Sequence, residues 1–153
     1  MAKIIVVNKP PWCYTGDVKI DGQPLDSRIF PENIIEGEFI QFDIPCRATA
    51  RRYAWKEFRL RPGEIYVLLY EDYNAHAAPS IKKIEGAEKV YEYGDAHGMR
   101  WAALLRLTAD RWLVDYDVPG HHGHYWHRKR VVGDKEGWQD ATFERLKEEA
   151  PEV

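Results

Sequence analysis

The sequence predicts a mainly β protein of the α+β class, either a single antiparallel sheet or a partly open barrel, with a short C-terminal helix. Three observations support this prediction. Aromatic residues, which favour strands, make up 13% of the 153 residues. Short apolar or alternating runs recur along the chain, separated by Gly, Pro and Asp. Only the end of the chain has helical periodicity. The length fits one domain, residues 1–153.

The N-terminal part predicts three short strand regions. Residues 3–8 are β-branched and end at a Pro-Pro pair, which cannot continue a ladder. Residues 17–25 alternate in polarity around Asp21-Gly22, a strong signal for a tight hairpin. Residues 36–45 alternate between apolar and polar side chains, as a half-buried strand does.

The middle of the chain is less regular. Residues 47–61 stay ambiguous, because their Ala, Arg, Lys and Glu favour helix while their apolar spacing fits neither period. A Pro-Gly turn follows, and residues 64–73 predict a central strand. Residues 74–87 predict a loop with at most one helical turn.

The C-terminal part predicts four consecutive strands, at residues 89–93, 99–108, 111–118 and 124–132. A short helix is expected to close the chain, with Asp140 as its N-cap. Its apolar stripe would consist of Trp138, Thr142, Leu146 and Ala150.

Composition narrows the function classes. No apolar run is long enough for a signal peptide or a membrane span, so we expect a cytosolic protein without membrane partners. The two cysteines lack metal-ligand spacing and are expected to be free thiols. The net charge of −3 is unevenly distributed, since residues 47–61 hold six Lys or Arg and one Glu. That basic, aromatic stretch suits either a nucleic-acid surface or a solvated face above the core.

The stretch VDYDVPGHHGHYWHRKR, residues 114–130, holds four of the six histidines. As a hairpin in which Val118 pairs with His124, it would place His127 opposite Asp115. One polar face would then carry Asp115, Asp117, Tyr125, His127 and Lys129. A slip of one residue would put His124 and Arg128 beside the aspartates instead.

Such a face would suit acid–base chemistry on a phosphodiester. A carboxylate orients an imidazole so that its other nitrogen exchanges protons near neutral pH, and nearby cations hold the phosphate. The candidate catalytic residues are Asp115, Asp117, His122 and His127. The candidate phosphate-binding or nucleic-acid-binding residues are Arg128, Lys129, Arg130, Arg51, Arg52 and Lys56.

A metal site and a purely structural role remain open for the same stretch. His122 and His124 form an H-x-H pair that could bind Zn or Fe, with Asp117 or His121 as a third ligand. The spacing matches no strong metal signature, and otherwise no cofactor is expected. Alternatively, the histidines are ordinary surface residues satisfied by local hydrogen bonds.

The C-terminal part, about residues 99–149, resembles the TumE-type toxins of small bacterial toxin–antitoxin pairs. The resemblance rests on Tyr116 and Asp117, on His121 and His122, and on His127 with Arg128 and Lys129. Pro119 precedes a glycine where that family would place its histidines directly, and the loop lengths differ. The resemblance implies a small protein that acts on RNA or binds near it.

Three functions follow from these patterns. The first is a nucleic-acid-directed protein, and if an enzyme, a histidine-dependent ribonuclease. The second is a non-catalytic β domain that acts as an accessory or assembly subunit, with its aromatic residues as interface anchors for a protein partner. The third is a metal-dependent small-molecule enzyme that uses the H-x-H pair.

Overall fold

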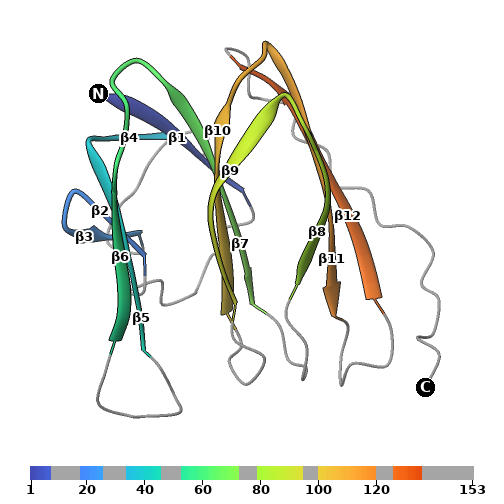
Figure 1. Cartoon of the computed structure of the whole chain (residues 1–153), viewed down its shortest axis with the longest axis horizontal. Helices are drawn as coiled ribbons and strands as arrows, with labels where there is room; N and C mark the ends of the chain where they lie inside the picture. The colour runs from blue at the N-terminus through green and yellow to red at the C-terminus, as the bar shows by residue number, and fades with distance from the viewer. Residues whose placement is uncertain are drawn as a thin grey trace.

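The computed structural model describes residues 1–7, 18–25, 34–45, 53–72, 79–94, 100–119 and 126–135. Within these ranges the chain forms β-strands in three layers, and the predicted mainly β fold is confirmed (Figure 1). The helix expected around Asp140 lies outside the described residues. No helix in the described ranges is both long and apolar enough to cross a membrane.

A five-stranded sheet forms the central layer. Its strands, in spatial order, are β4 (Ile34–Gly37), β1 (Ala2–Val7), β7 (Ile65–Asp72), β10 (Arg100–Leu107) and β9 (Ala87–Gly94). β1 and β7 run parallel, and the other neighbours run antiparallel. Parallel neighbours need a crossover connection, and the chain between β1 and β7 supplies it.

Both faces of the central sheet are buried. On β7, Leu68 and Tyr70 face one apolar core, while Val67 and Leu69 face another. The same division applies to β1 and β10. A strand that is covered on both sides needs apolar side chains at every position. This explains the unbroken apolar runs of the sequence, such as YVLLY at residues 66–70.

A four-stranded sheet covers the first core. It contains, in spatial order, β3 (Gln23–Pro24), β2 (Val18–Ile20), β5 (Phe39–Pro45) and β6 (Tyr53–Arg59). The hairpin predicted at Asp21-Gly22 is confirmed: both residues have positive φ, 52° and 80°, as a two-residue type I′ turn requires. The Asp21 carboxylate also accepts hydrogen bonds from the backbone of Glu38 and Phe39, at 2.8 and 3.1 Å, and so fixes the turn against β5.

A three-stranded sheet covers the second core. Its order is β12 (Trp126–Asp134), β11 (Arg111–Pro119) and β8 (Ser80–Glu85). β8 and β9 form one arm of a long antiparallel hairpin, and β10 and β11 form the other. The hairpin bends between the two strands of each arm, so that its two halves belong to different layers (Figure 1).

Two expectations about the strands need correction. The described strands form three sheets, rather than one antiparallel sheet or a partly open barrel, because the central strands are apolar on both faces and need two covering layers. Residues 74–87 contain the strand β8 instead of only a loop. A β-bulge at Lys82 lets Ile81 and Ile84, three positions apart, both reach the second core, so the strand does not alternate. The ambiguous stretch 47–61 contains the strand β6.

The bend of the long hairpin depends on Gly86. Its φ is +69°, and a β-carbon there would overlap the carbonyl oxygen of Arg111. Its own carbonyl accepts hydrogen bonds from the backbone of Thr108 and Ala109, at 2.9 and 3.2 Å. Only glycine allows both the left-handed backbone and this close approach of the two arms.

Gly86→Ala should therefore destabilise the fold by about 3 kcal/mol or more, from backbone strain plus steric overlap. Gly63→Ala is the matched control, because Gly63 also has a positive φ of 79° but nothing lies within 4 Å of the added methyl group. It should cost only about 1–2 kcal/mol. Urea unfolding of both variants measures the difference, and equal losses would contradict the proposed steric role of Gly86.

Candidate functional site

The β11–β12 hairpin is antiparallel as predicted, but its register differs from the expected one. Val118 lies opposite His127, three residues beyond the expected partner His124. Because the shift is an odd number of residues, it exchanges the two faces of β12. The predicted Asp115–His127 pair is therefore wrong, and Asp115 lies opposite Arg130 instead.

Packing and charge both favour the observed register. Val131 lies opposite Val114, and both side chains are fully buried in the second core. The expected register would have placed Arg128 opposite Val114. Arg128 instead lies opposite Asp117, so it stands beside the aspartates, as in the slipped alternative. Opposite charges on facing residues stabilise a strand pair.

We call the outer face of this sheet the charged face, formed by Lys82, Lys83, Asp115, Asp117, Arg128 and Arg130. Arg130 donates two hydrogen bonds to Asp115, with Nε–Oδ1 at 2.6 Å and Nη2–Oδ2 at 2.9 Å. The hydrogen bonds from Arg130, and then its charge and that of Lys83, lower the pKa of Asp115 below its ordinary value. The bidentate geometry fixes the Arg130 guanidinium on the sheet.

The second arginine of the charged face is held more loosely. Arg128 Nε lies 3.8 Å from the Asp117 carboxylate, and 66% of the Arg128 side chain is exposed. Lys82, at the bulge, is exposed and forms no ion pair or hydrogen bond within the described ranges. These residues surround a cavity of about 390 Å³. It is lined by Lys82, Asp115, Tyr116, Asp117, Arg128, Lys129 and Arg130.

The inner face of the same hairpin carries a buried ionic network. Glu71, at the end of β7, has a side chain only 3% exposed. Lys129 Nζ donates to both of its carboxylate oxygens, at 2.9 and 3.2 Å, and the Tyr116 hydroxyl donates to Oε2 at 2.6 Å. Burying a carboxylate costs several kcal/mol, which these three contacts offset. The network therefore ties the edge strand β12 to the central sheet.

Aromatic packing closes the network on one side. The Tyr116 ring stacks on Trp101, with centroids 5.6 Å apart and an interplanar angle of 21°. Burial, together with the Glu71 carboxylate, raises the pKa of Tyr116 above its ordinary value. Tyr116 therefore stays protonated and keeps its role as a hydrogen-bond donor.

The sequence-predicted residues do not form one site. His127 is half-buried and lies on the inner face with Lys129, not beside the aspartates. Lys56 is exposed on β6, in the sheet on the opposite side of the central layer from the charged face (Figure 1). The remaining candidates lie outside the described residues; they are Arg51, Arg52, His121, His122 and His124.

A metal site is tested only in part. Across the described ranges, no three His, Cys, Asp or Glu side chains are grouped closely enough to hold a metal ion. The H-x-H pair proposed as a Zn or Fe ligand set lies outside those ranges, so it stays a prediction.

Sequence reasoning missed Glu71 and Lys82. The signal for Glu71 was present, since a glutamate directly follows the apolar run of a strand predicted to be central. A carboxylate on such a strand needs a buried partner. Lys82 gave no comparable signal, because its position depends on the bulge in β8.

Comparison with known proteins gives no further guide to the site. No family profile, no curated protein and no solved structure matches the chain.

Lys129→Met should destabilise the protein by about 2–4 kcal/mol, because it leaves the Glu71 carboxylate buried without its ammonium partner. The loss is limited because the Lys129 side chain is 25% exposed, so water can reach the site in part. The triple variant Glu71→Met, Tyr116→Phe, Lys129→Met removes the carboxylate together with the hydroxyl and the ammonium that contact it, and should recover most of that loss. Urea unfolding of both variants measures the effect. A Lys129→Met variant as stable as the parent would show that the network does not hold β12.

Acid should weaken the parent through Asp115. Its pKa is lowered in the folded state, so its contribution is fully present above the ordinary aspartate pKa of about 4 and is lost as pH falls through the lowered value. Asp115→Asn should therefore be less stable than the parent at neutral pH, and the difference should shrink in acid. Asp134→Asn, the same change at an exposed position on β12, serves as the control. A constant difference between Asp115→Asn and the parent at all pH values would contradict this account.

Proposed function

We propose that the protein binds nucleic acid, with RNA as the expected target, through the charged face of the β8–β11–β12 sheet. The observation that carries this proposal is the cavity of about 390 Å³ whose cationic lining comes from both edge strands of that sheet. Lys82 and Arg128 would contact phosphates directly, since neither is held by a close ion pair. The cytoplasmic location expected from the sequence stays a prediction.

The spacing of the cations favours an extended polyanion over a single anion. Arg128 and Arg130 share one face of β12, two residues and therefore about 6.6 Å apart. Lys82 stands on the other edge strand, roughly two strand spacings or about 9.6 Å away. A ligand that meets all three must carry several negative charges in a row, as a nucleic-acid backbone does.

Asp115 and Asp117 reduce the positive charge of the charged face without cancelling it. Asp115 holds Arg130 in a fixed orientation but leaves part of its guanidinium facing the cavity. Asp117 is far enough from Arg128, at 3.8 Å, for a phosphate to replace it as the closer partner. Their negative charge opposes that of the ligand, so we expect moderate affinity and a marked dependence on salt.

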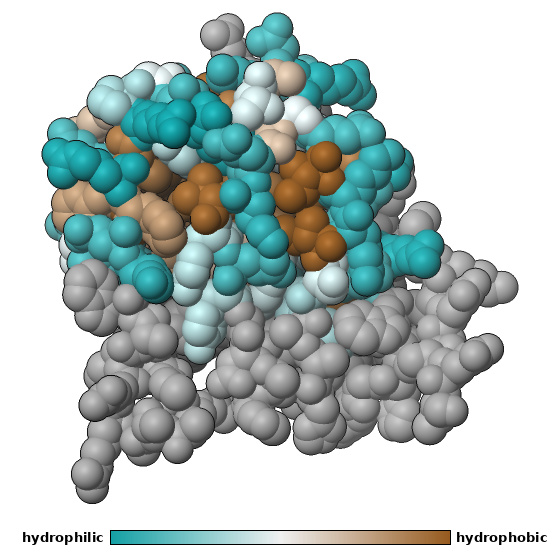
Figure 2. Space-filling model, viewed as in Figure 1, coloured by the Kyte–Doolittle hydropathy of each residue, from teal (hydrophilic) through white to brown (hydrophobic). Residues whose placement is uncertain are grey.

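The described surface suits a polar ligand better than a large apolar partner. Among the side chains that the structure describes, Met1 is the one large apolar group that is exposed. On the face shown in Figure 2, hydrophilic side chains separate the apolar surface into several patches. Contiguous apolar area is what usually marks a protein-docking surface.

The binding proposal is tested with a fluorescently labelled single-stranded RNA of about 12 nucleotides, long enough to cross one such sheet. Binding is measured by anisotropy between about 50 and 200 mM salt. Arg128→Ala and Lys82→Ala should each weaken binding and reduce the slope of log K against log salt by about 0.7, the loss of one phosphate contact. Arg111→Ala is the matched control, because Arg111 is an exposed arginine at the far end of β11.

Equal effects of Arg111→Ala and Arg128→Ala would contradict the proposed site, and the absence of binding at the lowest salt would contradict the function.

The same RNA samples can be used to measure cleavage. Ribonuclease activity stays a prediction. His127, the one histidine among the described residues, is half-buried on the inner face and not on the charged face. Cleavage that persists in His127→Ala would remove that residue from the mechanism.

A further inference from the structure

A second cavity, of about 330 Å³, lies at one end of the core between the central sheet and the β6-containing sheet. Ala2 and Leu60 line it and belong to that apolar core, and Pro62 and Met1 add further apolar surface. Its volume falls within the range of small-molecule sites. It is distinct from the charged face, which lies on the other side of the central sheet.

Main-chain hydrogen bonds hold the walls of this cavity together. Leu60 N donates to the Glu38 carbonyl at 2.9 Å, and Gly63 N donates to the Met1 carbonyl at 3.4 Å. Lys3 N donates to the Glu64 carbonyl at 3.1 Å. The start of β1, the β4–β5 link and the β6–β7 link thus form one connected frame. The cavity is therefore a built feature of the fold.

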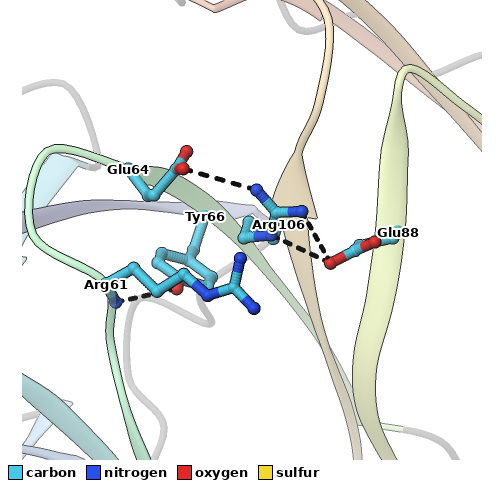
Figure 3. Close-up of polar contacts among 5 residues, drawn as sticks. All are labelled: Arg61, Glu64, Tyr66, Glu88 and Arg106. Atoms are coloured by element: carbon cyan, nitrogen blue, oxygen red, sulfur yellow. Dashed lines mark hydrogen bonds and ion pairs between the residues drawn. The ribbon is translucent and has the colours of Figure 1, made fainter.

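Two arginines flank the apolar wall. Arg59 and Arg61 lie on either side of Leu60 and are exposed, and within the described ranges their guanidinium groups form no hydrogen bond or ion pair. Figure 3 shows the Arg61 side chain extending beside Tyr66, whose hydroxyl accepts a hydrogen bond from the Arg61 backbone at 3.0 Å. The lining also contains one carboxylate, Glu38, so its net charge is positive.

The neighbouring Arg106, by contrast, is already paired with carboxylates. Its guanidinium contacts Glu88 at 2.8 Å and Glu64 at 3.4 Å, and only 18% of its side chain is exposed (Figure 3). Those two carboxylates are thus already engaged, and Arg61 shares neither of them. Arg59 and Arg61 are left as the cations that can meet an incoming anion.

We propose that this cavity binds a small amphipathic carboxylate. Arg59 and Arg61 would hold the carboxylate through the forked geometry that guanidinium groups present. A short apolar chain would pack against Leu60, Ala2 and Pro62, in contact with the first core. The combination of apolar walls with paired cations selects this ligand class over a nucleic acid, whose charges repeat along its length.

Sodium octanoate serves as the probe, measured by calorimetry on the full chain at constant ionic strength. Octanoate should bind, and Arg59→Ala and Arg61→Ala should each weaken it about tenfold, the loss of one charge-assisted contact. Acetate, which has the charge without the chain, and octanol, which has the chain without the charge, should each bind at least about tenfold more weakly. Arg111→Ala, an exposed arginine of the other outer sheet, should bind octanoate as the parent does.

Three results would overturn the proposal. They are no octanoate binding at millimolar concentration, octanol binding as tight as octanoate, and unchanged affinity in the Arg59→Ala, Arg61→Ala double variant. Both arginines are exposed, so their variants should unfold in urea at the parent's midpoint, which separates lost binding from lost folding. RNA binding at the charged face should be unaffected, so the two sites succeed or fail independently.

Discussion

The burial of the central sheet on both faces is the constraint from which the rest of this fold follows. Strands β1, β7 and β10 place apolar side chains at successive positions, so neither face can be left in water. In many proteins helices would cover such a sheet. Here two further sheets do so, and the chain must therefore pass repeatedly from one layer to the next.

These passages explain the special backbone positions. The long hairpin changes layers at Gly86, where the two arms approach so closely that no side chain fits. The β4–β5 segment changes layers at Glu38, which the Asp21 carboxylate holds through its backbone N–H. A layered β fold thus depends on a few corner residues, at which the backbone turns from one sheet into the next.

The outer sheets differ in how they are attached. The β6-containing sheet packs on the central sheet through buried apolar residues such as Ile40 and Phe42. The β12-containing sheet adds the buried contacts of Glu71 with Tyr116 and Lys129. An ionic contact of this kind contributes little net stability compared with apolar packing, and it forms in the register that places Lys129 opposite Tyr116. That register is the one that places Arg128 and Arg130 together on the charged face.

The sequence predicted the strands better than their assembly. Asp21-Gly22 and the C-terminal strands were evident from local chemistry, because turn residues and apolar periodicity act within a few positions. The β11–β12 register was not, since it depends on Val131 reaching a core formed with distant strands. In the Glu71 network, Tyr116 lies 45 positions and Lys129 lies 58 positions along the chain from Glu71. No local sequence pattern indicates contacts at such separations. Of the candidate site, the position of Arg128 beside the aspartates was predicted as the result of a one-residue slip, although the observed shift is three residues. The role of Lys82 was not predicted.

Arg128 and Arg130 lie on one face of β12 but differ in how firmly they are held. Arg130 has a structural role, and Arg128 is available for binding. Both lie on the same side of β12 opposite an aspartate, yet Arg130 makes two short hydrogen bonds and Arg128 a single contact of 3.8 Å. An arginine already engaged in a bidentate pair loses that pair when it turns to a phosphate, so its net gain is small. Arg128 is more exposed and breaks only a weak contact when it binds a phosphate, so most of its interaction energy with the phosphate contributes to binding. Binding at the charged face should therefore depend on Arg128 more than on Arg130, although their charges are the same.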